Sequence, residues 1–87
     1  MKIKRQTVTS SQIDSIGYDP ASLHMDVAFK QHKPTNPQSV YRYNNVPPEV
    51  HQAFLTAESK GKYFRDYIKK FPAQYPYRKL TPEEAAP

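Results

Sequence analysis

The chain has 87 residues, 37% of them hydrophobic, which suffices for one domain with a modest core and leaves no room for an enclosed active-site cavity. It has no cysteine, so disulfides, thiol nucleophiles and cysteine-based zinc sites are excluded. Its 13 Lys and Arg outnumber 8 Asp and Glu, and the formal charge of +5 attracts nucleic acid, acidic protein surfaces or anionic lipid.

The N-terminal segment 1–9, MKIKRQTVT, is basic and is not followed by the apolar run of a secretory signal. No apolar stretch approaches the about 20 residues that a membrane-spanning helix needs. We therefore predict a basic N-terminal tail over residues 1–9, a cytoplasmic location and no membrane partner.

Two neighbouring segments predict an antiparallel hairpin formed by residues 11–18 and 22–30. The second, SLHMDVAFK, alternates between apolar and polar side chains, as a half-buried strand does. The first runs into an Asp-Pro turn signal. The spacing of Ile13 and Ile16 breaks strict alternation, so the first strand is expected either to be bulged or to begin late, near Asp14.

A long loop and a third strand are predicted next. Residues 31–38, QHKPTNPQ, contain two prolines and a polar majority, which favours a loop. The β-branched and aromatic residues of SVYRYNN, 39–45, are typical of a strand.

The double proline after this strand indicates the start of a helix. Pro48 suits the first helical position, and Glu49 is favoured in the first turn by the helix dipole. Gly61 is predicted to end this helix. The spacing of three apolar residues predicts one apolar stripe, formed by Val50, Phe54 and Ala57 with Leu55 alongside.

A second helix is predicted in KYFRDYIKKF, residues 62–71, and ends at Pro72. Residues 72–87 are rich in proline and have two acidic residues near their end, so we predict an extended C-terminal tail. The predicted fold is α+β, with a three-stranded antiparallel β-meander followed by two C-terminal α-helices packed on one face. The predicted inner side of the second helix is formed by Phe64, Tyr67, Ile68 and Phe71.

Several short motifs recur along the chain in a characteristic order and spacing. They are Ser10 and Ser11, Ile16 to Asp19, Tyr41 and Tyr43, Val46 and Pro47, and Ala57, Ser59, Gly61 and Phe64. Together they resemble the KTSC domain, a small module that occurs at the C-terminus of some lysyl-tRNA synthetases and as a stand-alone protein in bacteria and phages. The resemblance covers roughly residues 10–71 and implies a fold, together with an RNA-binding function suggested by the synthetase association. The longer, glycine-free loop 31–38 departs from the family pattern.

Tyr41 and Tyr43 share one face of the predicted third strand, and Arg42 takes the other. In one interpretation the two rings point outward and stack on bases, with Arg42 at their edge. In the other, the rings pack under the helices and Arg42 faces outward. A small chain with few hydrophobic residues needs large rings in its core, which favours the second interpretation.

Residues 60–79 contain seven basic side chains and one acidic one, Asp66. Three of the basic residues recur at helical spacing and predict an exposed stripe that suits phosphates; the alternative is a solvated face that keeps the protein soluble. We therefore expect a binding module for RNA or another nucleic acid. The candidate contact residues are Arg42, Lys60, Lys62, Arg65, Lys69, Lys70, Tyr41 and Tyr43.

No pattern of an enzyme or a metal site is present. His24, His32 and His51 lack the spacing of a helical zinc site, and Gly17 and Gly61 are too few for a glycine-rich phosphate loop. We predict a non-enzymatic protein with no catalytic residues, metal or cofactor. The alternative to nucleic-acid binding is a protein-interaction module, such as a phage-encoded inhibitor that docks on a host protein.

Overall fold

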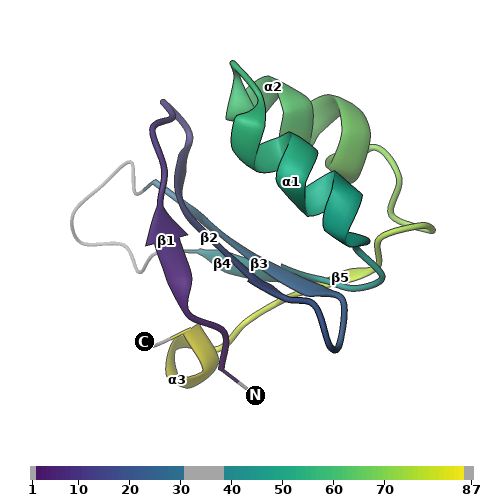
Figure 1. Ribbon diagram of the computed structural model, residues 1–87. Coiled ribbons are helices and arrows are strands. Elements are labelled where there is room, and N and C mark those ends of the chain that lie inside the picture. The colour runs from purple at the N-terminus through teal and green to yellow at the C-terminus, as the bar shows by residue number, and fades with distance from the viewer. Residues whose placement is uncertain (1, 31–38, 86–87) are drawn as a thin grey trace.

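The computed structural model describes residues 2–30 and 39–85, so the predicted loop 31–38 lies outside the described residues. The elements follow one another along the chain as shown in Figure 1. They are β1 (Arg5–Thr7), β2 (Ile13–Asp19), β3 (His24–Phe29), β4 (Val40–Tyr43), α1 (Pro48–Thr56), α2 (Lys60–Tyr63), the π-helix η1 (Phe64–Lys69), β5 (Tyr77–Lys79) and α3 (Pro82–Ala85).

The strands form one antiparallel sheet in the order β1-β2-β3-β4-β5. This confirms the α+β class, the predicted hairpin and the third strand beside it. The prediction of three strands is wrong, because β1 and β5 add one strand at each edge. Each of them has three residues, too few for an alternation to be recognised. They lie in the segments predicted as tails, 1–9 and 72–87.

The hairpin of β2 and β3 is closed by the side chain of Asp19. Its carboxylate accepts hydrogen bonds from the Ser22 hydroxyl at 2.7 Å and from the Ala21 N–H at 3.2 Å. These bonds, above all the one from Ser22, lower the pKa of Asp19. At the other end of the hairpin the pairing register shifts between Ile13 and Ser15, which confirms that β2 is bulged.

Helix α1 begins at Pro48, as predicted, but ends at Thr56 rather than near Gly61. The chain is extended after Thr56, at Ala57. The next helix, α2, is capped by Ser59, whose side chain accepts a hydrogen bond from the Lys62 N–H at 3.3 Å. The prediction of two helices is therefore wrong at this point as well as at the C-terminus, where α3 follows β5.

The two glycines permit close approaches between segments. A Cβ atom on Gly17 would lie 2.6 Å from the backbone oxygen of Lys4, next to β1. A Cβ atom on Gly61 would lie 2.7 Å from the side-chain oxygen of Gln12. Gly61 therefore lies inside α2 as a packing residue and does not end a helix.

Helix α2 runs directly into η1, whose hydrogen bonds span five residues instead of four. Phe64 and Ile68 are buried in η1, as predicted. Tyr67 and Phe71 are 60% and 47% exposed, so the prediction that they face inward is wrong. That prediction assumed the 3.6-residue turn of an α-helix, and the wider π-helical turn moves the apolar stripe.

The helices cover both faces of the sheet (Figure 1). α1, α2 and η1 pack on one face, as predicted for the helices, whereas α3 lies against the opposite face, where Ala85 contacts a small cluster of Ala28, Val40 and Leu80. The main core fills the space under the first three helices. It consists of Ile13, Ile16, Met25, Val27, Tyr43, Val46, Phe54, Phe64, Ile68 and Tyr75.

Candidate nucleic-acid interface

A pocket of about 320 Å³, called the aromatic pocket below, lies between η1 and the helix-covered face of the sheet. Its volume is at the lower end of the range for small-ligand sites. Most of its lining is aromatic and comes from β3, β4, η1 and β5, elements that are distant in sequence. The lining residues are Phe29, Tyr41, Tyr43, Phe64, Lys69, Pro72 and Tyr77.

Tyr41 and Tyr43 reach this pocket from β4. Tyr43 is 5% exposed, and its ring lies 5.4 Å from that of Phe64, so it belongs to the core. Tyr41 is partly buried and packs edge-on against Phe29 at 5.9 Å. The interpretation that these tyrosines are core residues is thus confirmed for Tyr43, and Tyr41 packs against that core. Burial raises the pKa of the Tyr43 hydroxyl above its ordinary value.

Tyr77 stands at the mouth of the aromatic pocket with 54% of its surface exposed. Its ring lies 5.5 Å from Tyr43 and 5.9 Å from Tyr41. Tyr77 is not among the predicted contact residues, because its segment was expected to form a tail. The available signal was the alternation of Tyr77 and Lys79 with Arg78 and Leu80, which is too short to be distinctive.

Two lysines place positive charge at this pocket. Lys69 is part of its lining, and Lys79 pairs with Tyr41 across β4 and β5. Directly paired residues on adjacent antiparallel strands project on the same face with Cβ atoms about 5 Å apart. Both lysines are exposed, and among the described residues neither forms an ion pair.

Arg65 and Lys70 are exposed on the same helical segment but share one carboxylate. Arg65 Nε lies 3.0 Å from Asp66 Oδ1, and Lys70 Nζ lies 3.6 Å from the same atom. The hydrogen bond from Arg65 is the main reason that the pKa of Asp66 is lowered. Exposed ion pairs of this kind are weak, so both cations are available to a phosphate that competes with Asp66.

The remaining predicted cations lie on α2. Lys62 is exposed, and Lys60 is partly buried with its Nζ 3.4 Å from the Ala57 carbonyl oxygen. The structure therefore places four of the five predicted helix cations in solvent and directs the fifth toward its own backbone.

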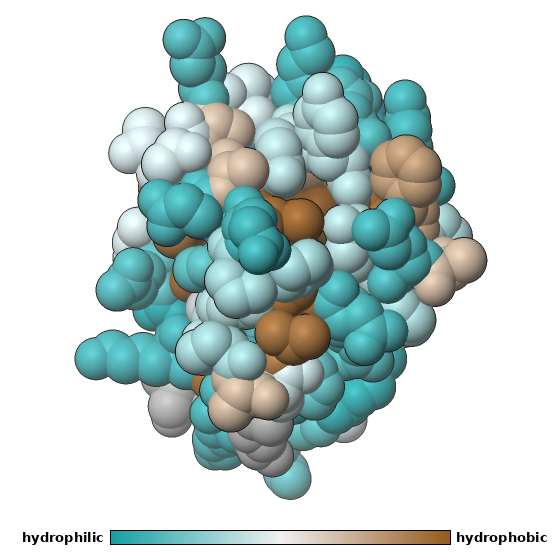
Figure 2. Space-filling model, turned by 45° about the vertical axis from the view of Figure 1, so that its right-hand side comes forward, coloured by the Kyte–Doolittle hydropathy of each residue, from teal (hydrophilic) through white to brown (hydrophobic). Residues whose placement is uncertain are grey.

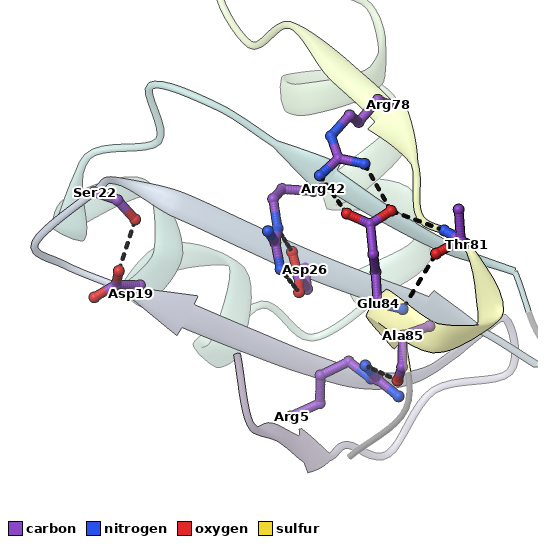
Figure 3. Close-up of polar contacts among 9 residues, drawn as sticks. All are labelled: Arg5, Asp19, Ser22, Asp26, Arg42, Arg78, Thr81, Glu84 and Ala85. Carbon is purple, nitrogen blue, oxygen red and sulfur yellow. Dashed lines mark hydrogen bonds and ion pairs between the residues drawn. The ribbon is translucent and has the colours of Figure 1, made fainter. Parts of the chain in front are cut away.

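Arg42 was also predicted as a contact residue, but the structure does not bring it to this site. It lies on the opposite face of β4, where its Nε and Nη2 atoms donate to Asp26 at 2.7 and 2.9 Å (Figure 3). The side chains of Arg42 and Asp26 are 5% and 1% exposed, respectively. The prediction of an outward-facing Arg42 is wrong, because the segment containing β5 and α3 covers this face of the sheet.

The same face is closed by a set of polar contacts that we call the α3 clasp (Figure 3). Arg78 forms a two-point ion pair with Glu84, at 2.7 and 2.9 Å. Glu84 also accepts from the Thr81 N–H at 3.1 Å, while its own N–H donates to the Thr81 hydroxyl. Arg5 of β1 donates to the Ala85 carbonyl oxygen at 3.0 Å. Arg78 is the main cause of a pKa of about 2 for Glu84.

A second pocket of about 280 Å³ lies beside β1 and α1 and includes Tyr18 and His51 in its lining. The two rings stack at 4.3 Å, and the Tyr18 hydroxyl donates to the Val46 carbonyl oxygen at 2.6 Å. Burial lowers the pKa of His51. These contacts join the hairpin to the start of α1, which is a structural role.

Within residues 2–30 and 39–85, no cluster of three or more His, Cys, Asp or Glu side chains is arranged to hold a metal ion. In the same ranges no helix has the length and hydrophobicity required to cross a membrane.

Comparison with known proteins connects this arrangement to a family. Residues 9–75 match the model of the KTSC domain. A KTSC domain protein of known structure from Yersinia pestis is 37% identical, with a TM-score of 0.75 over 91% of this chain and 99% of that one. An uncharacterized protein from Stutzerimonas stutzeri is 38% identical over 90% of this chain and 99% of its own length. A protein from Tsukamurella paurometabola is 38% identical over 74% of this chain and 87% of its own length.

Proposed function

The chain belongs to the KTSC domain family, and from this premise we propose that it is a small nucleic-acid-binding module, with RNA as the first ligand to test. The observation that supports the proposal is the position of Lys69 and Lys79 at the aromatic pocket. Lysines bind phosphate groups through charge and reach, and need no fixed geometry. In this proposal the module acts in the cytoplasm by binding, without catalysis, metal or cofactor.

The exposed cations of η1 and α2 extend this interface. Lys62 and Arg65 precede Lys69 in the chain and Lys70 directly follows it, and Asp66 is the only acidic residue in residues 62–70. On the side of the molecule shown in Figure 2, the surface of hydrophobic residues is interrupted by hydrophilic residues. A broad contiguous apolar patch would instead favour a protein partner.

The test is fluorescence anisotropy of a labelled single-stranded RNA and a labelled tRNA, titrated at low and at near-physiological salt. The variant K69E/K79E should lose most of its affinity. Each phosphate contact on a single strand contributes about 0.7 to the slope of log affinity against log salt, so losing both lysines should reduce the slope by about 1.4.

The matched control is K2E/K4E, because it makes the same change in net charge next to β1, at the edge of the sheet opposite to β5. It should retain affinity and salt dependence far better than K69E/K79E. Equal losses in the two variants would show that binding follows total charge rather than this interface. Absence of RNA binding at low salt would refute the proposal.

A protein-interaction module is the second candidate, and the edge of β5 favours it. The Leu80 N–H donates to Val40 and the Asn44 N–H donates to Pro76, each at 2.8 Å. Along an antiparallel ladder, hydrogen-bonded pairs of residues alternate with pairs that are not hydrogen-bonded to each other. Tyr77 and Lys79 belong to the second kind, so their backbone N–H and C=O groups point away from β4.

An open strand edge of this kind can pair with a strand of a partner, such as a host protein on which the module docks. Binding to one defined protein, together with no affinity for bulk RNA, would favour this function over nucleic-acid binding.

A further inference from the structure

The mouth of the aromatic pocket presents a ring whose position is not explained by core packing. Tyr77 lies on an edge strand and is more than half exposed, yet its ring is held beside those of Tyr41 and Tyr43. Behind it, the buried ring of Phe64 closes the inner end of the pocket. A flat apolar group that entered here would replace water at several aromatic surfaces at once.

The charges at the mouth define what such a flat group should carry. Lys69 lines the pocket and Lys79 flanks it, and the residues that line it include no acid within the described part of the chain. An aromatic ring with an attached anion fits this combination, because the ring can stack on tyrosine while a phosphate reaches the lysines.

From this geometry we propose that the aromatic pocket is a subsite for one unpaired nucleotide, with the base against Tyr77 and Tyr41 and a phosphate at Lys69 and Lys79. In a duplex each base is covered by its neighbours on both faces, so only an unstacked base can enter. The inference rests on the proposed function and adds a preference for single-stranded over double-stranded ligand.

The first experiment compares a short labelled oligouridylate with the duplex that it forms with oligoadenylate, by anisotropy under one salt condition. The single strand should bind about tenfold more tightly or better. Y77A should reduce that affinity by roughly tenfold, because stacking on an aromatic side chain contributes about that factor or more for each base. Y77F keeps the ring and should retain binding. Y67A is the matched control, since it removes another exposed tyrosine outside the pocket.

The second experiment does not depend on a variant. Uridine monophosphate is titrated into the unaltered protein, with ribose 5-phosphate as the control that lacks a base, and backbone amide shifts are followed by NMR. Shifts at Tyr77 and Lys69 with the nucleotide, and none of similar size with the control, are the expected result.

The outcomes separate the two proposals. Equal affinity for single strand and duplex, with no loss in Y77A, would overturn the nucleotide subsite while leaving a charge-based nucleic-acid module intact. Pocket shifts with ribose 5-phosphate as large as those with the nucleotide would also overturn the subsite, because the base would then contribute nothing. Absence of binding to any nucleic acid would overturn both.

Discussion

Replacing Arg42 with methionine should greatly destabilise the protein, although Arg42 looks like a surface residue in the sequence. R42M leaves the carboxylate of Asp26 buried without the two-point partner that it has at 2.7 and 2.9 Å. Removing one member of a buried ion pair costs about 3–5 kcal/mol. The total stability of a small domain is about 5–15 kcal/mol. With about 4–8 °C for each kcal/mol, the melting temperature should fall by roughly 12 °C or more.

Urea unfolding followed by circular dichroism measures this change directly. R65M is the matched control, because it removes an arginine from an exposed ion pair with Asp66 and should shift the midpoint little. The double variant D26L/R42M should recover most of the lost stability, since a buried pair can be replaced by apolar side chains of similar size. If R42M is no more destabilising than R65M, the argument that Arg42 is a buried structural residue is refuted.

Three further predictions concern the packing of the fold. G17A should destabilise the protein by about 1–3 kcal/mol, because the new methyl group meets backbone near β1. G61A should change the stability by less than about 1 kcal/mol in the same urea assay, because its methyl group meets the end of a flexible side chain and alanine has the higher helix propensity. Equal effects of the two variants would contradict this difference. Because the pKa of Glu84 is lowered to about 2, the contacts of Glu84 stabilise α3 fully at pH values above 4.5, the ordinary pKa of a glutamate, and are lost as the pH falls through about 2. NMR amide shifts of α3 followed during an acid titration should show this pH window. A titration midpoint near pH 4.5 would count against it. Y18F removes the hydroxyl that donates to the Val46 carbonyl oxygen and should lower the free energy of unfolding by about 1–3 kcal/mol. Y67F is the control at an exposed tyrosine. If Y18F loses no more stability than Y67F, the hydrogen bond of Tyr18 does not stabilise the fold.

The central elements of the fold were predictable because they carry long or strong local signals. The alternation in β3 and Pro48 at the start of α1 each specify their element without knowledge of distant residues. The short elements β1, β5 and α3 were not, because three or four residues show no period and depend on partners elsewhere in the chain. The π-helical turn of η1 was not predicted either, because the spacing of its apolar residues was interpreted with the 3.6-residue turn of an α-helix.

The candidate site was predicted in part. The exposed helix cations follow from composition and spacing, and the structure adds that Lys69 shares a pocket with Tyr41 and Tyr43. Alternation correctly placed Arg42 on the face opposite the tyrosines, but it could not reveal that Leu80 and α3 pack on that face. Tyr77 reaches the pocket only because β5 pairs with β4, a contact that no local pattern encodes.

The α3 clasp also determines how the two ends of the fold depend on each other. The hydrogen bond from Arg5 to Ala85 joins residues 80 positions apart, between a three-residue strand and a four-residue helix. Neither element is long enough to persist alone, so this bond can form only after the sheet between them has assembled. β1 and α3 should therefore open as one unit, at a lower free energy than the rest of the molecule, and a change at one end should loosen the other.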